Sequence, residues 1–126
     1  MTEIQSKKII LFDDDEDILL ICSYILNKDG WDVHTFTDCT QVIERVSSIM
    51  PAVILMDNWI PDVGGIETTQ QLKSHPKLKD IPVIYFSANW DIHQLAEIAG
   101  AESYLAKPFN LDDLLKKVND FCVLPT

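Results

Sequence analysis

Four short apolar runs in this sequence each end in a polar residue with chemistry of its own. Continuous apolar runs of this length are typical of strands that are covered on both faces of a parallel sheet. In such a sheet the carboxyl ends of neighbouring strands share one edge, and ligands bind there. We therefore expect three carboxylates, a hydroxyl and an ammonium group to converge at one edge. The runs are Lys8–Phe12, before Asp13 and Asp14; Ala52–Met56, before Asp57; Pro82–Phe86, before Ser87; and Ser103–Ala106, before Lys107 and Pro108.

Between these runs, apolar residues recur at helical spacing, as Leu19, Cys22 and Leu26 do after the first run. A less apolar strand over 31–36 completes a set of five strand–helix units. Repeated units of this kind imply a parallel sheet with helices on both faces, so the expected fold class is α/β. The 126 residues are predicted to form one domain over 1–126, with no output domain in this chain.

Capping and stop signals predict several helix boundaries. Gly30 can end the first helix as its C-terminal cap. Asp38 can cap the second helix, which should end before Pro51 because proline disfavours a helical residue ahead of it. The last helix is expected over Leu111–Val123.

The charge and the apolar content of the chain argue against several classes of partner. A net charge of −10 repels nucleic acid and anionic lipid, so neither is an expected direct partner. No apolar stretch approaches the roughly 20 residues that span a bilayer, and no apolar signal segment follows the first residues. The three cysteines are scattered without a CxxC spacing. We expect a cytoplasmic protein with reduced thiols and no membrane partner.

The predicted group of carboxylates suits a hard divalent cation. Mg²⁺ prefers oxygen ligands in an octahedron, and one or two carboxylates with substrate phosphate and water satisfy it. Asp14 and Asp57 can be direct ligands, with Asp13 behind them or acting through water. A backbone carbonyl from the loop after Asp57 can add a further oxygen. Without a cation, carboxylates packed together repel one another.

The same residues can carry phosphoryl chemistry. The Asp57 carboxylate can attack phosphorus and hold the group as an acyl phosphate. Lys107 can offer its ammonium to the incoming oxygens, and Ser87 its hydroxyl. Positioning and charge neutralisation supply most of the catalysis in phosphoryl transfer, so little else is required.

Four motifs together carry a resemblance to a known family. They are DDDED after the first strand, LMDNWIP around Asp57, YFSAN around Ser87 and YLAKPF around Lys107. In this order and spacing, across essentially the whole chain, the sequence resembles a bacterial two-component response-regulator receiver domain of the chemotaxis-regulator kind. The resemblance implies a flavodoxin-like, doubly wound (βα)5 fold with a five-stranded parallel sheet of order 2-1-3-4-5.

The resemblance also implies a role for each matching residue. Asp57 would be the phosphoacceptor, and Ser87 and Lys107 would bind the phosphoryl oxygens. Tyr104 would rotate inward when Ser87 moves toward the phosphate, which remodels the surface of the fourth helix, fifth strand and fifth helix. The bond between Lys107 and Pro108 would be cis. The implied Mg²⁺ ligands are Asp13, Asp14, Asp57 and the backbone carbonyl of Trp59.

The implied function is that of a switch and not of an enzyme with an outside substrate. Only self-phosphorylation and self-dephosphorylation are expected. His34, His75 and His93 share no ligand spacing, so the donor histidine must come from a histidine kinase or a histidine phosphotransfer protein. A downstream protein would bind the remodelled surface, and the chain would be a monomer or a phosphorylation-dependent homodimer.

Three positions depart from the family pattern without removing a reactive group. Trp59 stands where the family commonly has a smaller polar residue or methionine. Ile60 stands where methionine often precedes the proline, and Ser103 where an acid often precedes the aromatic residue. By the same resemblance, Trp59 would flank the path of the water that attacks an acyl phosphate. We hypothesise that its indole shields the phosphoryl group and lengthens its life, so a Trp59→Asn variant should lose phosphate faster.

The acidic run could serve other functions. An EF-hand loop starting at Asp13 would need glycine at its sixth position and glutamate at its twelfth, where the chain has Ile18 and Tyr24. A haloacid-dehalogenase-type phosphatase could use Asp13 and Asp15, but it would also need a cap domain and an acidic pair beyond the lysine. The acidic pair at 112–113 is expected inside the first turn of a helix, and no cap domain is expected. A receiver-shaped module that is never phosphorylated is a third possibility.

Overall fold

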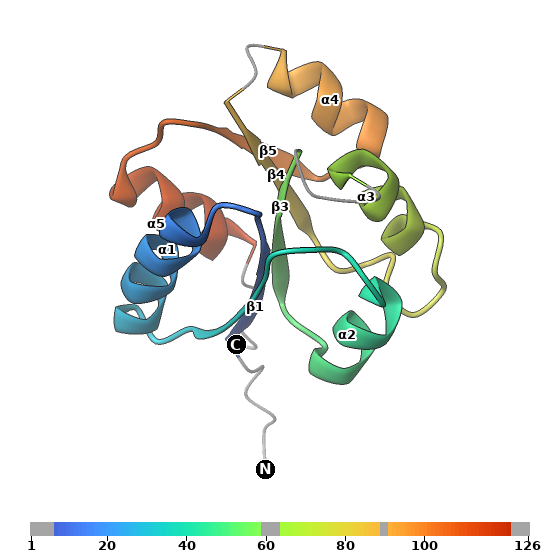
Figure 1. Cartoon of the computed structure of the whole chain (residues 1–126), viewed down its shortest axis with the longest axis horizontal. Helices are drawn as coiled ribbons and strands as arrows, with labels where there is room; N and C mark the ends of the chain where they lie inside the picture. Colours follow the sequence, from blue (N-terminus) through green and yellow to red (C-terminus); the bar gives the residue numbers. More distant parts are fainter. Residues whose placement is uncertain (1–6, 59–63, 89–90, 122–126) are drawn as a thin grey trace.

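The computed structural model describes residues 7–58, 64–88 and 91–121. Within them, five strands alternate with five helices along the chain (Figure 1). The elements are β1 (Lys8–Phe12), α1 (Glu16–Lys28), β2 (Asp32–Phe36), α2 (Val42–Ile49), β3 (Val53–Asp57), α3 (Gly65–Lys73), β4 (Val83–Ser87), α4 (Ile92–Ala99), β5 (Ser103–Ala106) and α5 (Leu111–Asp120).

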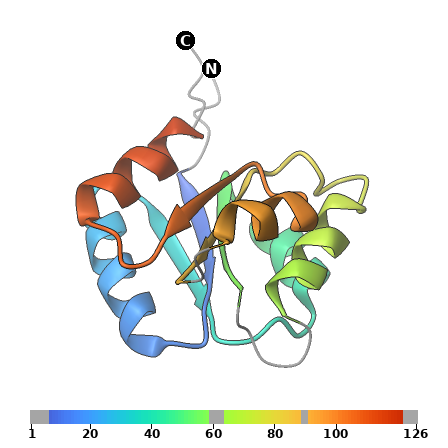
Figure 2. The same ribbon diagram turned by 90° about the horizontal axis from the view of Figure 1, so that it is seen from above.

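The five strands form one parallel sheet in the order β2-β1-β3-β4-β5. This confirms the α/β class and the sheet order that the family resemblance implied. Helices α1 and α5 cover one face of the sheet, and α2, α3 and α4 cover the other (Figures 1 and 2). Because every connection is a crossover from one strand to a parallel one, all five strands end at the same edge.

Apolar side chains fill both spaces between the sheet and its helices. Along β1, Ile9 and Leu11 join the cluster under α1 and α5, whereas Ile10 and Phe12 join the cluster under α2, α3 and α4. Strands β3 and β4 are buried at every residue, which explains their continuous apolar sequence. The edge strand β2 is only partly buried, and its sequence is correspondingly mixed.

The expected start of the second helix was wrong. Asp38 does not cap α2, which begins at Val42 with Gln41 in a left-handed conformation (φ 51°) before it. The Asp38 carboxylate instead accepts hydrogen bonds from the backbone N–H (3.0 Å) and hydroxyl (2.7 Å) of Thr40. It also pairs with Arg45 at 3.0 Å. Aspartate readily forms such a local turn, and here the turn takes precedence over the helix cap.

Other boundaries differ by one to three residues from those expected. β3 and β4 extend to Asp57 and Ser87, so these polar residues are the last of their strands. Helix α5 ends at Asp120 and not at 123, because the Phe121 N–H bonds the carbonyl of Val118 in a tighter final turn. The peptide bond before Pro108 is cis, as the resemblance implied. Among the described helices, none combines the length and apolar character that crossing a membrane requires.

Candidate functional site

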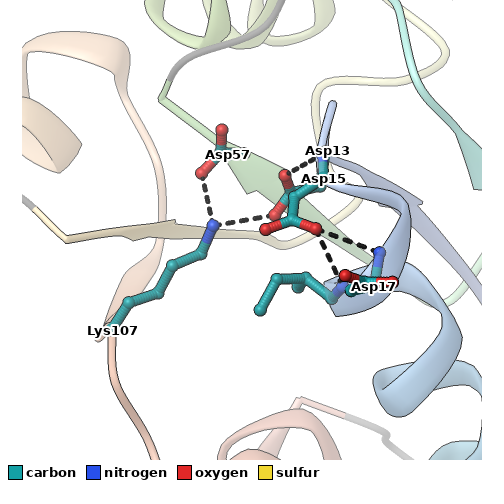
Figure 3. A network of polar contacts seen from close by, with 6 residues as sticks. Asp13, Asp15, Asp17, Asp57 and Lys107 are labelled. Carbon is teal, nitrogen blue, oxygen red and sulfur yellow. Dashed lines mark hydrogen bonds and ion pairs between the residues drawn. The ribbon is translucent and has the colours of Figure 1, made fainter.

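Lys107 joins two buried carboxylates at the carboxyl edge of the sheet. Its Nζ lies 2.8 Å from Oδ2 of Asp13 and 2.9 Å from Oδ1 of Asp57 (Figure 3). The three residues come from the ends of β1, β3 and β5, which lie far apart in the sequence. The structure therefore brings three of the expected residues into direct contact.

Strand pairing determines where these side chains arrive. Asp13 follows β1, and its N–H donates to the carbonyl of Phe36 at the end of β2 (3.1 Å). Asp57 ends β3 and is paired with Phe86 of β4. The Lys107 N–H donates to the carbonyl of Ser87 (2.9 Å), which extends the β4–β5 pairing by one residue. Each functional side chain thus lies at the point where its strand leaves the sheet.

Three carboxylates gather closely enough to share a cation. Asp13, Asp14 and Asp57 each offer an oxygen within 4.8 Å of the others, with Asp13 and Asp57 buried and Asp14 exposed. The other acids of the run have a helical role. Asp15 caps α1 by accepting from the N–H groups of residues 17 and 18, and its own N–H donates to Oδ1 of Asp13 (2.9 Å). The acidic run is therefore divided between a helix start and the site.

Burial and pairing act in opposite directions on the charges of the site. Burial raises the pKa of Asp13 above its ordinary value, although the hydrogen bond from Lys107 and the N–H of Asp15 oppose the rise. Burial alone would lower the pKa of Lys107, but its hydrogen bonds to Asp13 and Asp57 outweigh this and raise it. One ammonium faces at least two carboxylates, so the site retains excess negative charge that favours a further cation.

Ser87 and Tyr104 lie on the two strands beside the acids. Ser87 is 5% exposed at the end of β4, and in the β4–β5 register its partner is Ala106. Tyr104 is 38% exposed, and its ring meets the His93 ring of α4 edge-on, with 5.4 Å between centroids. The Tyr104 side chain therefore belongs to the surface between α4 and β5 in this structure.

The first residue of α3 presses against the end of β3. A Cβ built on Gly65 would lie 2.2 Å from the carbonyl oxygen of Asp57, so any larger residue would force the helix away from the site. The Gly65 N–H donates to the carbonyl of Asn58 (3.2 Å). The expected metal-ligating carbonyl of Trp59 and its proposed shielding indole lie outside the described residues.

The sequence alone did not reveal a polar pair that involves Asn58, the residue after Asp57. The hydroxyl of Tyr85, a fully buried residue of β4, donates to Oδ1 of Asn58. In the sequence, Tyr85 stands inside the apolar run Pro82–Phe86, which predicts a core position and no polar contact. The signal was present, because a tyrosine in a strand buried on both faces needs a hydrogen-bond partner for its hydroxyl.

The fold and this edge define a flavodoxin-like α/β domain whose acidic site is bridged by a lysine. The sequence matches the response regulator receiver domain family over residues 9–119, and the chain belongs to that family. Members of this family are signalling switches of two-component systems and not classical enzymes. Asp112 and Asp113 lie in the first turn of α5, as expected, so they form no acidic pair of the phosphatase type.

Relatives of several kinds share this domain. The chain is 30% identical over 110 residues to Protein PilG of Pseudomonas aeruginosa, covering 86% of this chain and 82% of PilG. It is 26% identical over 113 residues to the phosphate regulon transcriptional regulatory protein PhoB of Rhizobium meliloti, covering 88% of this chain and 50% of PhoB. The chain spans about half the length of such transcriptional regulators.

A solved structure agrees with the fold in detail. The signal receiver domain of a response regulator from Bermanella marisrubri is 27% identical in sequence, with a TM-score of 0.83. The match covers 93% of this chain and 98% of that one, so the whole domain is shared.

Proposed function

We propose that this receiver domain accepts a phosphoryl group on the Asp57 carboxylate in a Mg²⁺-dependent reaction. The donor would be a phosphohistidine of a histidine kinase or a histidine phosphotransfer protein. The observation that carries the proposal is the contact of Lys107 with both Asp13 and Asp57, at 2.8 and 2.9 Å, on the edge where the strands end. A lysine held by two buried carboxylates is already placed to meet a phosphoryl group that arrives between them.

The residues present fit a magnesium ion. Oxygens of Asp13, Asp14 and Asp57 lie within 4.8 Å of one another, and all three are hard ligands of the type that Mg²⁺ selects. Asp14 and Asp57 would hold the ion, with Asp13 behind them. A bound ion would neutralise the negative charge that develops on the phosphoryl oxygens during transfer.

The protein's own groups supply the remaining chemistry. An oxygen of Asp57 would attack phosphorus, the new O–P bond would form, and the P–N bond would break with its electron pair returning to the donor imidazole. Lys107 would move its ammonium from the carboxylates to a phosphoryl oxygen. Ser87, at the end of the neighbouring strand, would donate its hydroxyl to another phosphoryl oxygen.

The signal would leave the domain through the α4-β5-α5 face. Movement of Ser87 toward the phosphoryl group would open space for Tyr104, which now packs on His93 at the surface. A change at Tyr104 alters the face that a downstream protein, or a second copy of the chain, would bind. The expectation that the domain binds no nucleic acid rests on its acidic charge alone and stays a prediction, because relatives such as PhoB are transcriptional regulators.

Intact-protein mass spectrometry after incubation with acetyl phosphate tests the proposal. The wild-type protein should gain a single phosphoryl adduct only when Mg²⁺ is present. Asp57→Ala should gain none, and Asp80→Ala, which removes an exposed aspartate, should behave as the wild type. Release of phosphate without an adduct, dependent on Asp13, would indicate a phosphatase. If the protein forms no adduct and releases no phosphate, it would instead be a module that works without phosphorylation.

A further inference from the structure

The residue that follows Asp57 is held from three directions. The Asn58 N–H donates to the carbonyl of Phe86 in β4 (3.3 Å), and the Asn58 carbonyl accepts from the N–H of Gly65 (3.2 Å). Its side-chain Oδ1 accepts from the hydroxyl of Tyr85. The first two bonds join backbone to backbone, whereas the third depends on one particular pair of side chains.

Tyr85 reaches Asn58 from within the core. It is fully buried in the cluster beneath α3 and α4, where it packs with Met56, its partner across the β3–β4 pairing. Asn58 follows Met56 by two residues, just past the end of β3, and side chains two apart along an extended chain point to the same side. Tyr85 therefore pairs with Met56 through its backbone and meets Asn58 with its hydroxyl. Burial, and then the negative charge of Asp57, raise the pKa of Tyr85, so its hydroxyl keeps the proton that it donates.

We propose that Tyr85 is a positioning residue that acts through Asn58 to hold the backbone after Asp57 in the conformation that receives a phosphoryl group. The inference rests on the proposed function of Asp57. A carboxylate at the end of a strand is oriented by the chain on both sides of it. The preceding side is fixed by the sheet, and the following side is held at Asn58, where the hydrogen bond from the Tyr85 hydroxyl adds a side-chain contact to the backbone ones.

The alternative is that the Tyr85 hydroxyl bonds Asn58 only because a buried hydroxyl needs a hydrogen-bond partner, with no effect on the site. In that case its removal would alter the free energy of unfolding without changing the reactivity of the folded protein. The two roles are separated by the rate of phosphoryl uptake under conditions where every variant is folded, together with amide hydrogen exchange at Asn58 and Gly65. The exchange measurement needs neither metal nor phosphoryl donor.

The experiment is a double-mutant cycle on Tyr85→Phe and Asn58→Ala. Each single variant should slow adduct formation from acetyl phosphate about fivefold, the change that loss of one hydrogen bond corresponds to, and should speed exchange of the Gly65 amide by a similar factor. The double variant should be no slower than the slower single one, because both changes remove the same bond. Tyr24→Phe removes a hydroxyl from an exposed tyrosine of α1 and should leave both readouts unchanged.

Two results would overturn the inference while leaving the proposed function intact. One is a folded Tyr85→Phe that takes up the phosphoryl group at the wild-type rate with unchanged exchange at Gly65. The other is a pair of single effects that multiply in the double variant. If Tyr85→Phe does not fold, Asn58→Ala provides the test by itself, because Asn58 is only half-buried and lies outside the core cluster, so this variant should fold. The inference then requires that Asn58→Ala slows phosphoryl uptake. A wild-type protein that gains no adduct would refute the proposed function first and this inference with it.

Discussion

Lys73 and Lys107 place their ammonium groups at opposite ends of β4 and β5. Lys73, the last residue of α3, donates to Oε2 of Glu102 (2.7 Å) and to the carbonyls of Ile81 (2.7 Å) and Lys79 (3.1 Å). Glu102 in turn accepts from the N–H of Val83 at the start of β4 (2.8 Å). In this network one ammonium meets one carboxylate and two carbonyls, so its charge is balanced and its three hydrogens are used.

Lys107 lies in a different electrostatic situation. Its ammonium meets two carboxylates, Asp13 and Asp57, whose side chains are 1% and 7% exposed, and Asp14 lies next to them. The negative charge exceeds the positive charge on this edge. The Lys73 network, which only supports the fold, thus balances its charges, whereas the Lys107 network leaves an excess of negative charge that a divalent cation would neutralise.

The largest expected effect follows from removing Lys107. In Lys107→Met, Asp13 and Asp57 are left buried beside each other without a cation, and the free energy of unfolding should fall by about 3 kcal/mol in the presence of a chelator. Adding Mg²⁺ should restore a large part of the loss, because the ion binds only the folded arrangement of acids. Urea denaturation with and without Mg²⁺ measures both quantities. A loss that Mg²⁺ leaves unchanged would argue against a cation site here.

Removing Lys73 provides the matched case at the other end of the sheet. Lys73→Met leaves the Glu102 carboxylate and two carbonyls without their donor, so the free energy of unfolding should fall by roughly 2 kcal/mol, less than at Lys107 because Glu102 is more exposed. Mg²⁺ should not restore this loss, since a single carboxylate is left. Equal rescue of both variants by Mg²⁺ in the same urea titrations would show that the two networks do not differ in their affinity for a cation.

Neutralising Asp13 should raise the free energy of unfolding, whereas removing either lysine should lower it. Asp13→Asn keeps the acceptor for the Asp15 N–H but removes one of the crowded charges, so we expect the metal-free protein to gain about 1 kcal/mol at neutral pH. Because burial raises the pKa of folded Asp13 above 3.8, the wild type becomes more stable as the pH falls through that raised value. The advantage of the variant should therefore shrink on acidification.

Urea titrations of Asp13→Asn at neutral and acidic pH measure this gain. Asp80→Asn, at an exposed position, is the control and should show no advantage at either pH. An Asp13→Asn protein that is less stable than the wild type at neutral pH would show that Lys107 already balances the site.

The sequence predicted the site better than it predicted the network at the other end. Strand ends could be located from the apolar runs, and parallel strands must end at a common edge, so the meeting of Asp13, Asp57 and Lys107 followed from topology. The contact of Lys73 with Glu102 depends on where α3 ends and how β5 begins. Neither is determined by a periodic pattern, and the two residues are 29 apart.

Local turns account for the remaining differences. Asp38 is a good helix cap by residue type, but its bonds to Thr40 and its contact with Arg45 depend on side chains that a capping rule does not consider. The contact of Tyr85 with Asn58 could have been expected from the sequence. A tyrosine in a buried strand carries a hydroxyl that needs a hydrogen-bond partner, so an apolar run that contains one does more than fill the core.

The smallest effect is expected at Thr69, midway along α3 between the two networks. Among the described residues, its Oγ1 is the buried side-chain polar atom without a hydrogen-bond partner. Thr69→Val keeps the shape of the side chain and removes the unsatisfied hydroxyl, so the free energy of unfolding should rise by about 0.5–1 kcal/mol. Thr68→Val is the matched control, because the Thr68 hydroxyl donates to the carbonyl of Gly64 (2.7 Å) and its loss should destabilise. Urea denaturation of both variants decides the sign, and a loss of stability in Thr69→Val would reveal a partner for that hydroxyl in solution, most simply a water molecule.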